Sequence, residues 1–105
     1  MKKINLPETG SFGAKLPGRN LVEDSPYFKI INFNFRPGQG LPVHSHDIEG
    51  RVSILVLEGE GEYLADNDET MPAKPGDILV CDIAEPHGIK ADTDMRILVT
   101  IAPPI

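Results

Sequence analysis

The sequence predicts an all-β domain built as a sandwich or a barrel, and three observations lead to that prediction. Short apolar segments, several with alternating polar and apolar residues, are separated by turn residues at regular intervals. Ten glycines and ten prolines in 105 residues cut the chain into pieces that are too short for long helices. No segment of about twelve residues or more repeats its apolar positions with the period of an amphipathic helix.

The first part of the chain is predicted to be an arm. Residues 1–19 are polar and are interrupted by several glycines and prolines, and residues 20–23 form at most a short strand before a turn. We therefore divide the single domain into an N-terminal arm with short strands, residues 1–26, and a barrel, residues 27–105.

The first clear strand is predicted over residues 27–36, which read YFKIINFNFR. Phe33 and Phe35 fall on one face of this strand, and Asn32 and Asn34 fall on the other. We expect the phenylalanine face to point into the barrel and the asparagine face to be exposed to solvent.

The next segments are predicted to form an extended segment, a strand and its hairpin partner. Residues 41–46 are extended, and residues 47–50 form a loop. Residues 51–57, which read RVSILVL, are almost wholly apolar, as is typical of a strand covered on both faces. Residues 62–65 are expected to pair back on this strand across a turn that contains two glycines.

The remaining strands are predicted to be short until the last one. Residues 69–73 form a short strand, residues 78–81 a buried strand, and residues 87–90 a short extended segment. Residues 95–102, which read MRILVTIA, form the last strand, and Pro103-Pro104 ends it.

Composition and charge exclude several classes of function. The net charge of −6 disfavours nucleic acids and anionic membranes as partners, because both bind clustered Lys and Arg. The chain has neither a membrane-spanning apolar run nor the apolar centre of a signal peptide, so we expect a soluble cytoplasmic protein. Cys81 is the only cysteine, and its apolar neighbours predict a buried, unreactive thiol.

The three histidines are the candidate functional residues. His44 and His46 form a His-x-His pair, and residues at this spacing in an extended segment point to the same face. His87 lies in a later extended segment and could complete a site of three nitrogen ligands. The spacing alone leaves an ordinary alternative open, because a His-x-His pair also occurs by chance.

The histidines and their flanking glycines resemble the two sequence motifs of the cupin superfamily. The residues that carry the resemblance are Gly38, His44, His46 and Gly59 in the first motif, and Pro75, Gly76, Pro86 and His87 in the second. It covers residues 27–102 and implies a single-domain jelly-roll β-barrel, also called a double-stranded β-helix. It also implies that all three histidines are ligands of a metal inside the barrel.

The glutamate ligand of the family is missing where the motif places it. Counting back from Gly59, the position falls on Val52, and counting forward from His46 it falls on Gly50 or Arg51, none of which is a carboxylate. The nearest acids are Glu49 and Asp47 in the same loop, and Glu49 is the candidate ligand. Three outcomes are open. Glu49 completes the site or acts as a general base, water completes a three-histidine site, or the lost ligand means weak or absent metal binding.

The resemblance implies a function for such a site. Neutral imidazoles suit one divalent transition metal (Fe, Zn, Ni, Cu or Mn), and three protein ligands leave positions open for a small organic, preferably anionic, substrate. We predict a metal-dependent enzyme, with a dioxygenase favoured over an isomerase or a hydrolase. The alternatives are a non-catalytic small-ligand binding or sensing cupin and a barrel with a vestigial metal site. Exposed sheet edges in small cupins also predict a homodimer.

Overall fold

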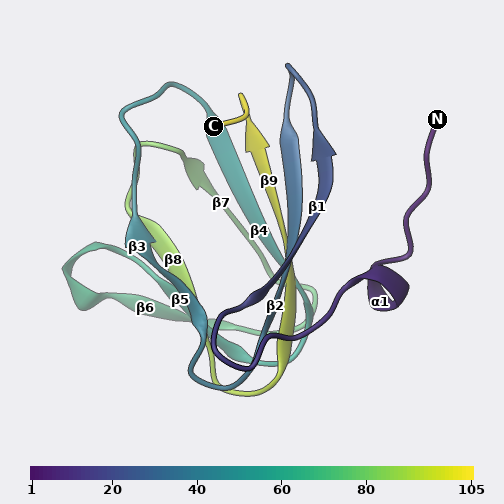
Figure 1. The fold of residues 1–105 in the computed structure, drawn as a ribbon. Helices are drawn as coiled ribbons and strands as arrows, with labels where there is room; N and C mark the ends of the chain where they lie inside the picture. Colours follow the sequence, from purple (N-terminus) through teal and green to yellow (C-terminus); the bar gives the residue numbers. More distant parts are fainter.

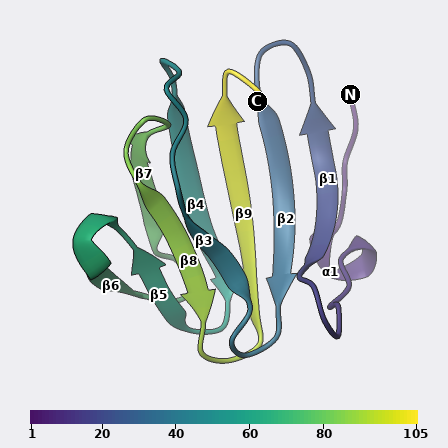
Figure 2. The same cartoon turned by 60° about the vertical axis from the view of Figure 1, so that its left-hand side comes forward.

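The computed structural model describes residues 1–105 as two antiparallel β-sheets packed face to face, with a short helix outside them (Figure 1; Figure 2). The strand orders are β1-β2-β9-β4-β7 in the five-stranded sheet and β3-β8-β5-β6 in the four-stranded sheet. The elements are α1 (Leu6–Thr9), β1 (Gly18–Asp24), β2 (Lys29–Phe35), β3 (Gly40–His44), β4 (Arg51–Glu58), β5 (Gly61–Leu64), η1 (Asp66–Asp68), β6 (Thr70–Ala73), β7 (Ile78–Asp82), β8 (His87–Ala91) and β9 (Met95–Ala102). The predicted all-β jelly-roll barrel is confirmed.

The core lies between the inner faces of the two sheets, because apolar residues alternate along the long strands. On β4, Val52, Ile54 and Val56 are buried, and on the neighbouring β9 the same is true of Ile97 and Val99. β4 and β9 pair directly, so that these rows of side chains lie next to each other. The four-stranded sheet closes the core from the other side.

The predicted hairpin between residues 51–57 and 62–65 is wrong. β5 pairs with β6 and β8 in the four-stranded sheet, whereas β4 lies between β7 and β9 in the other sheet. The chain changes sheets at Gly59, whose φ is +83° and where a Cβ would collide with the carbonyl oxygen of Asp94. A hairpin turn and a corner between sheets use the same turn residues, so the local pattern does not separate them.

The prediction of a buried strand at residues 78–81 is half right. Leu79 and Cys81 face the core, whereas Ile78 and Val80 are 56% and 52% exposed on the outer face. β7 is the edge strand of the five-stranded sheet, and nothing in the chain covers its outer face at these positions.

The prediction that Asn32 and Asn34 are exposed to solvent is wrong, although the phenylalanine face does point inward. Both asparagines are fully buried because the N-terminal arm crosses the outer face of β2 and covers them. Asn32 Nδ2 donates to Asn34 Oδ1 at 3.1 Å and to the Ile97 carbonyl oxygen at 3.0 Å. Asn34 Nδ2 donates to the carbonyl oxygen of Ser11 at 3.1 Å, which ties the arm to the sheet.

Two further features hold the arm in place. The ring of Phe12 lies between two guanidinium groups, with Arg36 4.4 Å and Arg96 4.8 Å from its centroid. The unexpected helix α1 follows Asn5, whose side-chain oxygen accepts from the backbone N–H of Glu8. α1 lies beside β1 and β2, on the side away from the four-stranded sheet (Figure 1). β1 belongs to the arm as predicted from the sequence, but it is also a strand of the five-stranded sheet. The division of the chain into an arm and a barrel at residue 26 stays a prediction.

The structure contains no helix with the length and apolar character required to span a membrane.

Tyr63 ties the two sheets together through a buried hydroxyl group. Its Oη lies 3.0 Å from the carbonyl oxygen of Ile54 on β4 and 3.1 Å from that of Asp77, and it can donate to either. Burial raises the pKa of Tyr63 to about 12, and the nearby Asp77 carboxylate acts in the same direction.

Replacing this tyrosine tests the hydroxyl bridge. Tyr63→Phe removes the hydroxyl donor near the Ile54 and Asp77 carbonyl oxygens, of which that of Asp77 also accepts from the backbone N–H of Val56. The loss of this one hydrogen bond is expected to lower the free energy of unfolding by about 1 kcal/mol near neutral pH. The pKa of about 12 in the folded protein lies above the value of about 10 in an unfolded chain, so the contribution is present below pH 10 and is lost between pH 10 and 12.

Urea unfolding at about pH 8 and about pH 11 measures this difference. We expect the gap between the wild-type protein and Tyr63→Phe to narrow at the higher pH. Tyr27→Phe is the control, because Tyr27 is 80% exposed. A gap that stays constant with pH would contradict the assignment of the shift to the buried hydroxyl.

Candidate functional site

The four-stranded sheet brings two of the histidines side by side. His44 ends β3, His87 begins β8, and the two residues are direct partners across the antiparallel pair. Direct partners present their side chains on the same face, and the ring centroids are 4.5 Å apart. Gly88 allows this close approach, because a Cβ there would meet Leu41 O at 2.6 Å and Val43 N at 2.9 Å.

The third histidine lies just beyond the end of β3. The backbone N–H of His46 donates to the carbonyl oxygen of Ile83 at 3.2 Å, which holds this part of the loop against the segment that precedes β8. The rings of His46 and His44 have their centroids 5.8 Å apart. All three imidazoles are therefore gathered at one end of β3.

The protonation of two of these rings follows from their hydrogen bonds. His44 Nδ1 lies 2.8 Å from the carbonyl oxygen of Pro42, and His87 Nδ1 lies 2.6 Å from that of Glu85. A carbonyl oxygen can only accept, so each Nδ1 carries the proton in the neutral ring. Nε2 then keeps its lone pair, which is the arrangement that a metal-binding histidine requires.

Burial also favours the neutral form of His87. Its side chain is 5% exposed, and desolvation lowers its pKa below the usual value for histidine. The hydrogen bond to Glu85 opposes this shift, whereas the proximity of His44 and His46 adds to it. A neutral imidazole is the form that binds a metal ion.

The histidines line a single cavity of about 210 Å³ between the two sheets. Its remaining walls are apolar side chains from β2, β3, β4, β9 and the C-terminal segment. They are Ile31, Phe33, Leu41, Val52, Ile54, Val99, Ile101 and Ile105. Apart from the imidazoles, no side chain in this lining can donate or accept a proton or a hydrogen bond.

The donor set fits a transition metal in its chemistry, whereas the present ring orientations do not converge. No group of three or more His, Cys, Asp or Glu side chains is placed so that it could hold a metal ion. The ring plane of His44 is inclined by 71° to that of His46 and by 59° to that of His87. The side chains of His44 and His46 are exposed at the β3–β4 loop, so they can rotate without disturbing the core.

The structure separates the two positions considered for a carboxylate ligand. Val52, on which the family's glutamate falls when counted back from Gly59, lines the cavity beside the histidines. Glu49 is exposed and lines a different, surface cavity together with Asp47 and Asp82. The structure therefore does not bring Glu49 to the histidines, and its role as a ligand or a general base stays a prediction.

The inward-facing aromatic residues and the single cysteine divide between the cavity and the core. Phe33 lines the cavity, whereas Phe35 and Tyr63 are core residues. Cys81 is buried and free, and burial raises the pKa of its thiol, with a smaller contribution from Glu85. The prediction of a buried cysteine is confirmed. The sequence did not reveal which apolar residues line the cavity, Ile105 among them. An aliphatic residue that lines a cavity and one that packs in the core have the same local sequence pattern.

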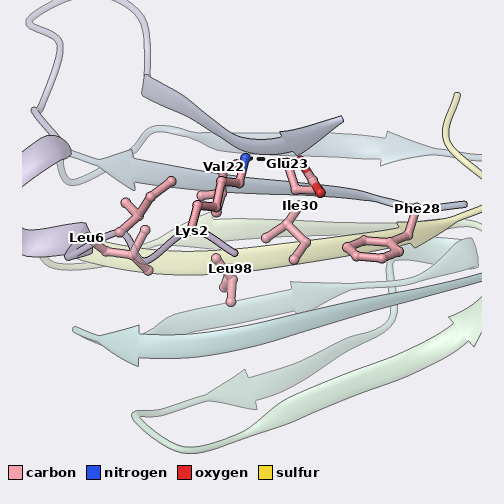
Figure 3. A pocket seen from close by; sticks show the side chains of 8 residues that line it. Lys2, Leu6, Val22, Glu23, Phe28, Ile30 and Leu98 are labelled. Atoms are coloured by element: carbon pink, nitrogen blue, oxygen red, sulfur yellow. Dashed lines mark hydrogen bonds and ion pairs between the residues drawn. The ribbon is translucent and has the colours of Figure 1, made fainter. Parts of the chain in front are cut away.

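A second cavity, of about 400 Å³, lies on the outer face of the five-stranded sheet (Figure 3). The N-terminal arm and β1, β2 and β9 form it, and Figure 3 shows the ion pair between Lys2 and Glu23, with an N–O distance of 3.0 Å, at its edge. Its lining contains no histidine or cysteine. It is larger than the histidine cavity but lacks a comparable set of ligands.

Comparisons with known proteins agree with the fold. Residues 32–101 match the family described as Cupin domain. The chain is 34% identical over 67 residues to a protein of Thermotoga maritima named oxalate-binding protein. This match covers 62% of the chain and 54% of that protein, so the chain spans about half the length of this curated relative.

Two solved structures show the same architecture. An RmlC-like cupin protein from Desulfovibrio desulfuricans has a TM-score of 0.95 and 53% sequence identity, over 100% of this chain and 99% of that chain. KdgF from a Halomonas species has a TM-score of 0.78 at 22% identity, over 95% of this chain and 92% of that chain, which shows a shared fold alone. Because residues 32–101 match the Cupin domain and a close structural relative is a cupin, this chain belongs to the cupin family.

Proposed function

We propose that this protein binds one divalent transition metal through His44, His46 and His87, and that a small organic molecule binds beside the metal in the same cavity. The observation that carries the proposal is the hydrogen-bonding pattern that His44 and His87 share. Both donate Nδ1–H to a backbone carbonyl group and keep Nε2 free at the same cavity. Metal binding then requires rotation of at least one ring, since the three do not converge.

The lining of the cavity narrows the chemistry that we propose. A metal held there supplies Lewis acidity and open coordination positions and, if it is iron, redox chemistry with dioxygen. Isomerases and hydrolases generally need a protein acid or base in reach of the substrate, and apart from the histidines the lining contains none. We therefore favour a dioxygenase over an isomerase or a hydrolase.

A non-catalytic ligand-binding or sensing protein is the second candidate. It is supported by the same lack of proton-transfer groups and by the relative whose name is oxalate-binding protein. A vestigial metal site is the third, supported by Val52 in the place of the family's glutamate. The cytoplasmic location and the absence of nucleic-acid and membrane partners stay predictions from composition.

Metal content tests the proposal directly. We expect protein purified without a histidine tag, after exposure to Fe, Zn, Ni, Cu or Mn, to retain about one equivalent of metal by elemental analysis. His44→Ala is expected to lose most of it, because one of three nitrogen ligands is removed. His44 is exposed, so the variant is expected to keep the stability of the wild-type protein.

Glu49→Gln is the matched control for this experiment. It removes the charge of an exposed loop carboxylate outside the cavity, so we expect it to retain the metal. Loss of metal in Glu49→Gln would instead support the hypothesis that Glu49 is the fourth ligand. No metal uptake by the wild-type protein would contradict the proposal and leave the vestigial site.

Restoring the family's carboxylate gives a test in the opposite direction. Val52→Glu places an acid in the cavity beside the histidines and is expected to destabilise the metal-free protein, because a buried carboxylate lacks a partner there. Added Zn²⁺ would pair with it, so we expect a larger metal-induced rise in the melting temperature than in the wild-type protein. An equal or smaller rise, measured by thermal unfolding, would argue against a metal at this end of the cavity.

We also propose a homodimer that forms through the outer face of the five-stranded sheet. An apolar patch lies on this face where Leu55 of β4 pairs with Ile78 of β7, and the exposed Val80 extends it. We expect light scattering coupled to size exclusion to give twice the mass of the chain, and Val80→Glu to give the monomer. A monomeric wild-type protein would contradict this proposal.

A further inference from the structure

We propose that the histidine cavity selects a small ligand with a branched aliphatic body and a single polar head group, and that Ile105 is a residue that determines this specificity. The inference rests on the proposed function in one respect, which is that the head group binds at the metal. Everything else in it concerns the walls of the cavity.

The walls form a continuous apolar surface on the five-stranded sheet. Ile31 of β2 pairs with Val99 of β9, and Val99 pairs in turn with Ile54 of β4. Ile101 of β9 pairs with Val52 of β4 in the same way. These branched side chains all line the cavity, so the part of a ligand that faces the five-stranded sheet meets only hydrocarbon.

No positive side chain lines the cavity to meet a second charge on the ligand, and the ammonium group of Lys29 at its mouth already donates to the backbone oxygen of Ile105. Arg51 is exposed and pairs with Asp82 at 2.7 Å, and the lining contains neither an arginine nor a lysine. A second carboxylate, or several hydroxyl groups, would lose water in this cavity without gaining a partner. The cavity therefore disfavours dicarboxylates and sugars. It favours a ligand with one negative charge, which would bind at the metal.

The size of the cavity sets the size of the ligand. A volume of about 210 Å³ lies below the range of about 300–1,000 Å³ that is usual for ligand pockets. The ligand is therefore a molecule of a few carbon atoms rather than a large aromatic compound.

Ile105 closes this cavity from the C-terminal segment. It follows β9 and the two prolines, and it lines the cavity although it is 41% exposed, which places it at the mouth. Lys29, the first residue of β2, donates from Nζ to the backbone oxygen of Ile105 at 2.6 Å. This hydrogen bond holds the C-terminal segment beside the start of β2. The C-terminus lies at the same end of the molecule as the β3–β4 loop, at the top of Figure 1. Unlike the other apolar residues of the lining, Ile105 lies outside any strand.

Three carboxylic acids with the same type of head group test the ligand class. Acetate, 3-methylbutanoate and succinate are titrated into Zn²⁺-loaded and into metal-free protein, and binding is followed by ligand-observed NMR, which detects millimolar affinities. We expect 3-methylbutanoate to bind at least tenfold more tightly than acetate, since each buried CH₂ group contributes about fourfold. We expect succinate to bind at least tenfold more weakly than 3-methylbutanoate.

Ile105→Ala tests the role of the mouth residue in the same titrations. We expect a loss of about fivefold in affinity for 3-methylbutanoate, little change for acetate, and unchanged metal content. Lys29→Met, which removes the tether, is expected to act in the same direction. Ile78→Ala is the matched control, because it removes the same side chain from the outer face of β7, at a position that does not line the cavity.

The outcomes separate this inference from the proposed function. The predicted order of the three acids, together with the effect of Ile105→Ala, supports the inference. If the protein takes up no metal and still shows this order, the inference about the cavity walls is supported and the proposed metal site is contradicted. Succinate binding as tightly as 3-methylbutanoate, or no binding of 3-methylbutanoate to either form, overturns it. Equal effects of Ile105→Ala and Ile78→Ala overturn the role of Ile105.

Discussion

The inward row of branched aliphatic side chains on β2, β4 and β9 is the constraint on which the rest of the structure depends. Burial of these side chains fixes the register of the five-stranded sheet, because a slip of one residue would turn every one of them to the outside. Over part of its length the row packs against Tyr63, Ala73 and Ile89 of the four-stranded sheet and forms the core. Elsewhere it faces β3 and the first residue of β8, where the side chains are histidines. The cavity therefore forms where the apolar packing between the sheets gives way to imidazole rings.

The chemistry of the site follows from this position. A buried imidazole is more stable when it is neutral, which is why the pKa of His87 is lowered, and hydrogen bonds from Nδ1 to backbone oxygen atoms leave Nε2 of His44 and His87 free. Val52, one of the positions on which the motif places the family's carboxylate, lines the cavity with an apolar side chain. A metal bound by the three neutral rings would keep its full charge in an apolar surrounding, and the negative charge that balances it would come from the ligand. The residues that line the cavity are therefore the basis of both proposals, the metal site and the ligand class.

The sequence was informative where a pattern has one structural meaning. The alternation in residues 95–102 corresponds to β9, and the spacing of the histidines, read with the resemblance to cupins, led to residues that do lie at one cavity. It was less informative where one pattern serves two structures. Gly59 suits a hairpin as well as a corner between sheets, so β5 was assigned to the wrong partner.

Long-range contacts account for the other differences. Asn32 and Asn34 are polar residues on the outer face of a strand, and only the position of the arm, through Ser11 and Phe12, explains why they are buried. Ile105 is a single aliphatic residue outside any strand, and its place at the cavity depends on Lys29, which is far from it in sequence. The exposed Ile78 and Val80 show the same limit, because an apolar residue on the outer face of an edge strand and one in the core have the same local pattern.

The measurement that tests the central claim most directly is a long-range ¹H–¹⁵N correlation spectrum of the histidine side chains, recorded without metal and with one equivalent of Zn²⁺. The chain has only three histidines, so each ring can be followed separately. The account predicts that Nδ1 carries the proton in His44 and His87 of the metal-free protein, and that Nε2 of all three rings shifts to the range of a metal-bound nitrogen when Zn²⁺ is added. Rings that keep their metal-free shifts, or a shift confined to one exposed histidine, would contradict the three-histidine site.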